Sequence, residues 1–418
     1  MARQMKESGI EWIGDIPANW MFCRLKNYFS FEKGKNAALY TQEYIGEHQG
    51  TFPVYSGQTE NNGVMGLINS YDYDIPKCLF TTTVGAKVMT PKILEGKFSL
   101  SQNCLIMKSI QDCCIEFFYY ALLPLFDYEK SLIPSYMQPS LRIEDLKKYG
   151  FYIPTITEQK KIADFLDDEC TKIDRVIEKT IATIEEYKQL RQSIIANAVT
   201  KGIRPNRETK NSGIKWVEKI PNEWESINPK ALFTQRKDKA TAGEKQLTAS
   251  QQYGVIYQDE YMELTGARIV TVEKDFDILK HVEAGDFVIS MRSFQGGLEY
   301  SEKSGSISSA YVMLIPDLNL VYPRFYKWLF KSSVYINALQ STSNLVRDGQ
   351  AMRYSNFAQV RLYTVPLDEQ KEIADYLDKK CAEIDTLIEK KTALLAEIES
   401  YKKSVIYEYV TGKKEVVQ

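Results

Sequence analysis

Side chains that can hydrogen-bond the edges of nucleic-acid bases gather in a glycine-rich segment of the second half of the chain. Residues 290–297 place Arg292, Ser293 and Gln295 beside two glycines. Arginine can bridge O6 and N7 of guanine, and glutamine can bridge N6 and N7 of adenine, each worth about 1–3 kcal/mol of discrimination. Glycine lets a backbone approach a partner closely. Similar side chains recur at Ser308, Arg347, Gln350, Arg353 and Tyr354. These segments predict recognition loops.

A comparable set of polar side chains lies in turn-rich segments of the first half. Residues 51–58 predict a short strand that leads into a polar loop, and the following Asn-Asn-Gly is a strong turn signal. The candidates for base contact there are Gln58, Asn61, Asn62, Lys87, Gln102, Asn103, Tyr136 and Gln138. Any one of them could equally belong to a solvated loop, but the clustering favours recognition. Residues 99–101 and 306–308 are both Ser-Leu/Ile-Ser, which predicts one scaffold with different loops.

The motifs by which enzymes activate substrates are missing. His48 and His281 have no Cys or carboxylate partners at metal-ligand spacing, so neither a metal site nor histidine-based catalysis is expected. There is no G-x-x-x-x-G-K-[ST] phosphate loop, no G-x-G-x-x-G dinucleotide motif and no Asn/Asp-Pro-Pro-aromatic motif of amino-methyltransferases. We therefore expect a non-catalytic chain that itself binds no cofactor.

An internal repeat indicates which elements position these loops. Residues 158–200 and 369–411 align without a gap and agree at about 20 of 43 positions. The front of each half also repeats, because Gly-Ile-x-Trp and Ile-Pro-x-x-Trp occur at residues 9–20 and again at residues 213–224. The stretches between these matching segments share little sequence. Such a pattern predicts like frames around two unlike recognition domains.

Both repeated segments have the apolar spacing of long amphipathic helices. The positions expected to pack are Ile162, Leu166, Ile173, Ile177, Ile373, Leu377, Ile384 and Ile388. Thr157 is a plausible N-cap of the first helix, and Gly202 marks its end. A continuous helix of about 42 residues would extend roughly 60 Å. Because such a helix buries little surface alone, we expect the two copies to pack on each other.

The chain is expected to have an α+β fold with four segments. These are a first recognition domain at residues 1–152, a central helix at 153–204, a second recognition domain at 205–362 and a C-terminal helix at 363–418. Two similar α/β domains would be joined by an antiparallel coiled coil with pseudo-twofold symmetry. Strands are predicted at residues 77–84, 100–107, 267–272, 286–291 and 311–315, and shorter helices at 115–126 and 323–339.

Composition fits a folded cytoplasmic protein of two or more domains. The 418 residues include 44% hydrophobic and 26% charged residues, and there is no apolar run long enough to cross a membrane. Seven cysteines without metal spacing fit reduced thiols, and Cys170 and Cys381 stand at equivalent repeat positions, where a small buried packing residue is expected. The formal net charge of −2 is low for a nucleic-acid binder, unless partners supply much of the phosphate contact.

The duplicated arrangement resembles the specificity (S) subunits of type I restriction-modification systems. The resemblance is carried by the Pro154, Glu158-Gln159, Ile162-Ala163 and Leu166-Asp167 stretch and by its copy from Pro366 to Asp378. The paired tryptophan-containing openings and residues 285–290, Gly-Asp-Phe-Val-Ile-Ser, add to it. The resemblance spans the whole chain.

Membership of this family implies two target recognition domains, each reading one half of a bipartite DNA site, with helices that fix the gap. It also implies two methyltransferase subunits that use S-adenosylmethionine to methylate adenine, and two motor/nuclease subunits that require ATP and magnesium. No base-contacting residue transfers from the family, because its recognition domains diverge.

Three alternatives stay open. The chain could be a coiled-coil scaffold whose two ends bind proteins rather than nucleic acid. A self-sufficient methyltransferase is disfavoured by the missing cofactor motifs. A specificity subunit that serves modification without cleavage is the nearest alternative.

Overall fold

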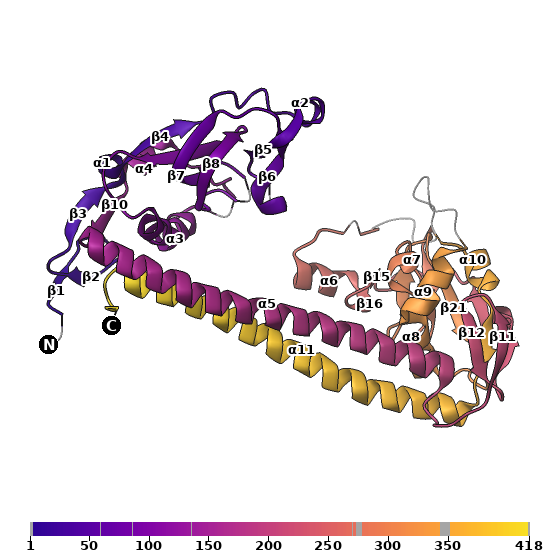
Figure 1. Cartoon of the computed structure of the whole chain (residues 1–418). Coiled ribbons are helices and arrows are strands. Elements are labelled where there is room, and N and C mark those ends of the chain that lie inside the picture. The colour runs from indigo at the N-terminus through magenta and orange to yellow at the C-terminus, as the bar shows by residue number, and fades with distance from the viewer. Residues whose placement is uncertain are drawn as a thin grey trace. The chain divides into compact units, whose positions relative to one another are not determined.

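The computed structural model describes residues 3–58, 60–85, 87–134, 136–269, 271–272, 278–342 and 352–416. The chain divides into two compact units, Met1–Ile181 with Ala393–Gln418, and Ala182–Thr392. Each unit holds one mixed domain and part of both long helices, α5 (Ile156–Lys201) and α11 (Leu367–Val410), as the path of the chain in Figure 1 shows. The predicted α+β class with two domains and two long helices is confirmed.

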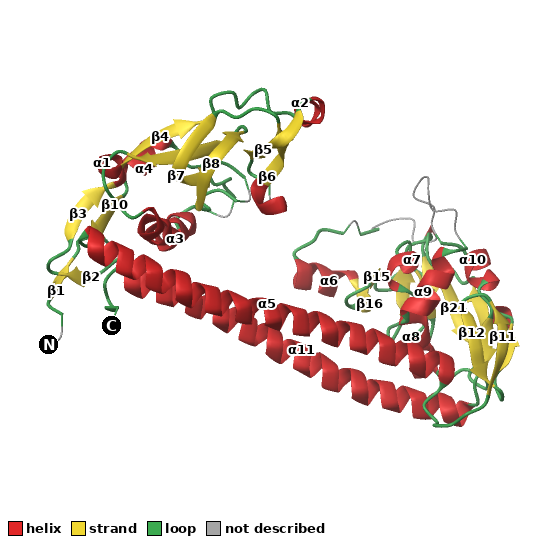
Figure 2. Ribbon diagram, viewed as in Figure 1, coloured by secondary structure: helices red, strands yellow, loops and turns green. Residues whose placement is uncertain are grey.

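A six-stranded sheet forms the centre of the first unit's domain (Figure 2). Its order is β4-β9-β7-β8-β5-β6, and β5 and β8 are its one parallel pair among the described residues. The strands are β4 (Phe29–Lys33), β5 (Gln49–Tyr55), β6 (Val64–Ile68), β7 (Tyr73–Thr82), β8 (Lys92–Leu100) and β9 (Cys104–Ser109). Both faces of β7 are covered near its end, because Leu79 joins one core cluster and Phe80 joins another.

Helix α3 (Ile115–Ser131) covers one face of this sheet. Its side chains pack with Leu79 and Met107, and the Phe118 ring lies 5.0 Å from the Phe29 ring. The remaining elements are short: β1 (Met5–Glu7), β2 (Asp15–Pro17), β3 (Met21–Arg24), α1 (Leu25–Tyr28), α2 (Gln42–Glu47), η1 (Asn61–Gly63), α4 (Ile143–Lys148) and β10 (Gly150–Ile153). Strands β1 and β2 pair with each other, and β3 pairs with β10.

The second unit's domain has a smaller central sheet in the order β14-β21-β18-β19. The Phe233 ring at the start of β14 contacts the rings of Phe287, Tyr326 and Phe330, at centroid distances of 5.6, 5.2 and 5.4 Å. The strands are β11 (Thr209–Ile214), β12 (Val217–Pro221), β13 (Glu225–Ile227), β14 (Phe233–Arg236), β15 (Leu247–Ser250), β16 (Gly254–Tyr257), β17 (Lys280–Val282), β18 (Phe287–Ile289), β19 (Glu299–Tyr300), β20 (Gly305–Ile307), β21 (Val312–Pro316) and β22 (Leu362–Thr364). The helices are η2 (Pro229–Ala231), α6 (Gln258–Thr265), α7 (Ser293–Gly296), α8 (Pro323–Lys331), α9 (Ser333–Gln340) and α10 (Tyr354–Gln359).

The two domains share a scaffold. The antiparallel order β4-β9-β7 of the first unit corresponds to β14-β21-β18 of the second, and the pair β3–β10 corresponds to β13–β22. In each domain a helix follows the middle strand, α3 after β9 and α8 after β21. The predicted single scaffold with different loops therefore holds for the central strands and the first helix.

Within each unit, the portions of α5 and α11 pack antiparallel. In the first unit, Ile162 and Leu166 share a core cluster with Val405 and Ile406, and the rings of Phe165 and Tyr409 are 4.4 Å apart. In the second unit, Ile373 and Leu377 share a cluster with Ile195 and Val199. Ile173 and Ile384 are also buried, whereas Ile177 and Ile388 are only half-buried. Of the eight residues predicted to pack, six are therefore buried, and four of these lie in clusters that contain residues of both helices.

Local differences from the sequence predictions have identifiable causes. Helix α5 begins at Ile156, so Thr155 rather than Thr157 caps it, its hydroxyl accepting from the Glu158 amide at 3.4 Å. The predicted helix 323–339 is two helices, because Ser332 is extended and its hydroxyl caps α9. The strand prediction at 267–272 is wrong for the described residues there, which form neither helix nor strand.

Burial accounts for the cysteines. Cys170 and Cys381 are buried on the packing faces of α5 and α11, and burial raises the pKa of both thiols. Among the described helices, none is long and apolar enough to span a bilayer.

Candidate nucleic-acid interface

The repeated Glu-Gln pair at the start of each long helix makes the same contacts in both units. The Trp20 indole donates to Glu158 Oε1 at 3.4 Å, and the Trp224 indole donates to Glu369 Oε2 at 3.1 Å. An arginine joins each pair, Arg3 in the first unit and Arg207 in the second, and lies over the tryptophan ring at 5.4 and 5.8 Å. The matching Trp and Glu motifs of the sequence thus form one repeated polar cluster.

The glutamine of the pair holds the neighbouring domain helix in place. Gln159 accepts from the backbone amide of Cys114 at 3.1 Å, and Gln370 accepts from that of Tyr322 at 2.7 Å. Cys114 and Tyr322 immediately precede α3 and α8. Each glutamine also donates to a backbone carbonyl just before its own helix, Pro154 at 3.0 Å and Val365 at 2.7 Å. A buried amide with both ends satisfied fixes the angle between domain and long helix.

Two further equivalent aspartates continue the pattern. Asp167 accepts from the Tyr120 hydroxyl, and Asp378 accepts from the Trp328 indole, both at 2.7 Å. Burial, followed by this hydrogen bond to Asp167, raises the Tyr120 pKa.

The long helices are tied to each other in each unit by equivalent ion pairs. Asp174 lies 2.6 Å from Lys402 Nζ in the first unit, and Asp385 lies 2.8 Å from Arg191 Nε in the second. We call these repeated contacts, from the Trp–Glu cluster to the ion pairs, the frame.

A glycine follows the end of each long helix, next to the buried tryptophan of the frame. Gly202 and Gly412 have φ of +73° and +71° at the ends of α5 and α11, the left-handed conformation that favours glycine as a helix stop. A Cβ on Gly202 would lie 3.5 Å from the Trp224 ring, and one on Gly412 would lie 3.0 Å from the Trp20 ring. The C-terminal end of α11 thus meets the first tryptophan opening, as the end of α5 meets the second.

The candidate residues of the first domain lie in loops that are linked to one another by backbone hydrogen bonds. We define the first loop cluster as the described residues of 56–63, 83–91, 101–103 and 134–141. Backbone hydrogen bonds join its loops: Ser101 donates to Tyr55, Thr83 donates to Asn103 and Leu141 donates to Thr83, each at 2.8 Å. The structure thereby brings together Gln58, Asn61, Asn62, Lys87, Gln102, Asn103, Tyr136 and Gln138.

Most of these side chains are presented to solvent. Asn61, Asn62, Gln102, Asn103, Tyr136 and Gln138 are exposed, whereas Gln58 and Lys87 are half-buried. Gln58 has a role inside its turn, because its amide donates to the Val64 carbonyl at 2.6 Å.

Left-handed backbone marks the same loops. Four of the five described non-glycine residues with positive φ lie there, Asn61 (46°), Asn62 (54°), Met89 (54°) and Asn103 (62°). Such conformations cost free energy and concentrate at functional sites.

In the second domain the loop after β18 carries the strongest candidates. Arg292 and Gln295 are exposed on a turn held by Gln251, which donates to the Arg292 carbonyl at 3.2 Å, and by Gln340, which donates to the Phe294 carbonyl at 2.6 Å. Gly297 has φ +79°, and a Cβ there would lie 2.0 Å from the Phe330 carbonyl oxygen, so this turn requires glycine.

The other candidate residues of the second domain differ in exposure. Ser293 is only 1% exposed and its hydroxyl accepts from the Ser290 amide at 2.8 Å, so its prediction as a contact residue is wrong and it instead closes the turn. Ser308 and Arg353 are exposed. Tyr354 is half-buried and donates to the Phe233 carbonyl at 3.2 Å. Arg347 and Gln350 lie outside the described residues.

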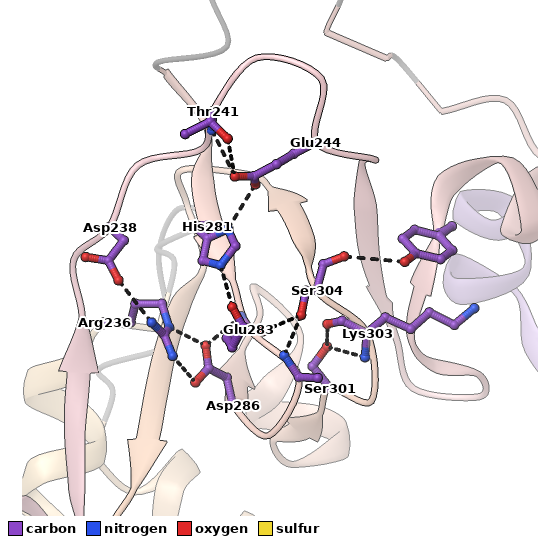
Figure 3. Close-up of polar contacts among 12 residues, drawn as sticks. Arg236, Asp238, Thr241, Glu244, His281, Glu283, Asp286, Ser301, Lys303 and Ser304 are labelled. Carbon is purple, nitrogen blue, oxygen red and sulfur yellow. Dashed lines mark hydrogen bonds and ion pairs between the residues drawn. The ribbon is translucent and has the colours of Figure 1, made fainter.

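A polar network supports this domain (Figure 3). Arg236 of β14 pairs with both oxygens of Asp286, at 2.6 and 3.0 Å, and Asp286 also accepts from the Glu283 amide. His281 lies between Glu244 and Glu283, with 3.0 Å from each ring nitrogen to a carboxylate oxygen. The network joins the β14–β15 connection to β17 and fixes the start of β18, which leads into the Arg292 turn.

His281 has two carboxylate partners, although its sequence context predicts none at metal-ligand spacing. Burial lowers the His281 pKa, but its hydrogen bonds to the two carboxylates outweigh burial and leave the pKa raised. Of the two partners, Glu283 lies only two residues after His281 and could be found from the sequence, whereas Glu244 is distant in sequence. Within the described part of the chain, no cluster of three or more His, Cys, Asp or Glu residues could hold a metal.

Comparison with known proteins places the chain in a family. A family model described as type I restriction modification DNA specificity domain matches residues 17–186 and again 221–400. The type I restriction enzyme MjaVIII specificity subunit of Methanocaldococcus jannaschii is 22% identical over 429 residues, covering 95% of this chain and 93% of that protein.

Two further matches differ in extent. The type I restriction enzyme MpnII specificity subunit of Mycoplasma pneumoniae is 32% identical over 127 residues, 30% of this chain; the match spans 37% of that relative's length. A chain from a solved type I R-M system structure covers 96% of this chain and 99% of its own length, with a TM-score of 0.67 and 12% identity, which supports the fold. The chain belongs to the family of type I restriction-modification specificity subunits.

Proposed function

We propose that this chain is the DNA-recognition subunit of a type I restriction-modification complex, in which each domain reads one half of a bipartite site. The observation that carries the proposal is the pairing of like frames with unlike loops. The frame contacts recur at equivalent positions, whereas the exposed loop residues, such as Asn61 and Asn62 in one domain and Arg292 and Gln295 in the other, differ in type. Two domains with different base-reading side chains would read different half-sites.

The long helices would set the gap between the half-sites. Helices α5 and α11 have 46 and 44 residues, and no break interrupts either. Major-groove faces recur about every 10–10.5 base pairs, so two rigidly joined readers bind well only at a matching gap.

Catalysis would come from partner subunits. Two methyltransferase subunits would supply S-adenosylmethionine chemistry, and two motor/nuclease subunits would use ATP and magnesium. The formal net charge of −2 fits this division, because the partners would then supply much of the phosphate contact.

Exposed apolar residues on the helices offer a docking surface for the methyltransferase subunits. The first unit exposes Val176 (48%) and Tyr401 (60%), and the second exposes Leu387 (42%) and Leu190 (48%). Val176 and Leu387 are equivalent in the repeat, as are Leu190 and Tyr401. One such pair in each unit fits two copies of one partner.

Charge substitutions test this docking. We expect Val176→Glu with Tyr401→Glu to reduce the methyltransferase stoichiometry from two to one, measured by native mass spectrometry, since a carboxylate cannot be buried unpaired. Gln192→Glu, at an exposed polar position of α5, is the control and should leave two copies bound. Retention of both subunits by the double variant would remove these residues from the interface.

DNA binding tests the function itself. The complex of this chain with its methyltransferase should shift a DNA library selectively, with affinity that falls steeply as salt increases. A protein-binding scaffold would produce no salt-dependent, sequence-selective shift, and that result would favour the alternative.

A further inference from the structure

Lys92 occupies an unusual position in the first loop cluster. It is the first residue of β8, is half-buried, and its ammonium group donates to both the backbone carbonyl and the side-chain Oδ1 of Asn62, the latter at 2.8 Å. Burial, and then the charge of Lys87, lower its pKa. An ammonium that makes two internal hydrogen bonds has fewer donors left for a phosphate.

The turn that Lys92 contacts is strained. Asn61, Asn62 and Gly63 have φ of 46°, 54° and 80°, three successive left-handed residues. Asparagine adopts this conformation more readily than most residues, but the conformation still raises the free energy of the folded state. The turn is closed on the other side by Ser56, whose amide donates to the Gly63 carbonyl at 2.8 Å. Without the lysine, the corner that carries the two exposed asparagines would lose a charge-assisted anchor.

We propose that Lys92 is a positioning residue for specificity: it holds the Asn61–Asn62 corner so that these side chains meet base edges in one half-site. The inference rests on the proposed function. Asparagine reads adenine through N6 and N7 only when both atoms of its amide are aligned, so a small rotation of the corner would relax discrimination. Lys92 would act through Asn62 and would not contact DNA.

The test compares two lysine-to-methionine variants on one strand. Lys92 pairs with Phe80 near the end of β7, whereas Lys97 pairs with Asp74 near its start, so Lys97→Met removes the same charge five residues further along β8. Base preference is measured by selection from a library of randomised half-sites, using the full complex with its methyltransferase. Lys92→Met should relax discrimination at one or two positions of one half-site by about tenfold. Lys97→Met should change neither half-site.

Two companion variants and the salt dependence separate positioning from phosphate binding. Lys92→Arg, which keeps the donors, should restore most of the discrimination, and Asn62→Gly, which keeps the left-handed backbone, should lose it at the same base positions. The slope of log affinity against log salt should not change in Lys92→Met. A slope reduced by about one, with equal loss on all sequences, would identify a phosphate contact and overturn the proposal.

Unaltered base preference in Lys92→Met would also overturn it. Misfolding is recognised separately, because an unfolded first domain would lose its entire half-site while the other is still read. If the wild-type complex selects no sequence at all, the proposed function fails rather than the role of Lys92.

Discussion

The two units share the contacts of the frame but differ in their exposed loops. In the frame, Gln159 and Gln370 share two equivalent hydrogen bonds, and the ion pairs of Asp174 and Asp385 are equivalent. In the loops, the first domain has four non-glycine residues with positive φ, whereas the second domain has the Arg292 turn, which requires Gly297. The buried polar contacts that position each domain are thus repeated, whereas the exposed loop residues differ. Positioning and recognition therefore belong to different parts of the molecule.

This separation has a physical basis. A buried polar group must be satisfied, so a change at one frame position leaves its partner unpaired at a cost of about 1–3 kcal/mol. Exposed loop side chains carry no such cost, which leaves them open to substitution. If geometry and recognition are separate in this way, the two frames should be energetically equivalent and the loops should act independently.

The largest effect is expected from the buried tryptophans. Trp20→Ala and Trp224→Ala should each destabilise their own unit by about 3–5 kcal/mol, because each removes a fully buried indole and a hydrogen bond to the repeated glutamate. Hydrogen exchange resolved along the chain measures this unit by unit.

The half-buried Trp12 and Trp216 provide matched controls, whose substitution by alanine should cost less. If one of the two buried tryptophans were dispensable, the frames would differ in energy despite their like contacts.

An intermediate effect is expected from the frame glutamines. Gln159→Leu and Gln370→Leu should each cost about 1–3 kcal/mol, since the amides of Cys114 and Tyr322 would be left unpaired. Denaturant unfolding with unit-specific exchange measures the cost. Gln370 has three hydrogen bonds and Gln159 two, so Gln370→Leu should be the more severe; the reverse order would contradict the contact account.

A loop substitution should affect reading and not stability. Arg292→Ala should relax one base position in one half-site by about 1–3 kcal/mol of discrimination, measured by methylation of variant sites. Arg361→Ala, which removes an arginine that donates to the Ser226 hydroxyl in the same unit, is the control and should leave base preference unchanged. Equal loss at both half-sites in Arg292→Ala would indicate failed assembly.

The smallest effect is expected from His281. Its raised pKa means that its contribution to stability is present below the unfolded pKa and is lost as pH rises through the folded value. The lowered pKa values of Glu244 and Glu283 mean that their contribution is lost on acidification. The cluster therefore stabilises the second unit most in the mildly acidic range between these titrations. His281→Gln should lower the unfolding temperature at pH 6 by a few degrees, and by less at pH 9; a pH-independent loss would contradict the charge assignment.

The frame was predictable from the sequence, because repetition reveals it. The Glu-Gln pair, the Trp openings and the apolar positions Ile162 and Ile373 each occur twice, and the structure places them in equivalent contacts. The roles of individual residues were less accessible: Thr157 and Thr155 are both acceptable caps, and only the helix start distinguishes them.

The loops were predictable in location but not in detail. Convergence of the Asn61, Asn103 and Gln138 segments follows from turn signals placed at strand ends, yet Ser293 has the type of a contact residue and is buried. Lys92 was missed because its partner Asn62 is 30 residues away and no local pattern connects them. The described residues of 267–272 form no strand, and they follow Gly266, whose left-handed conformation ends α6.

Genome-wide methylation mapping tests the central claim most directly. It would be carried out in cells that express the chain with its methyltransferase, for the wild type and for a variant lacking residues 180–183 of α5. We predict a two-part motif with a fixed gap in the wild type, and in the variant the same two half-sites at a different gap. Altered half-site letters with an unchanged gap, or an uninterrupted motif in the wild type, would contradict the account.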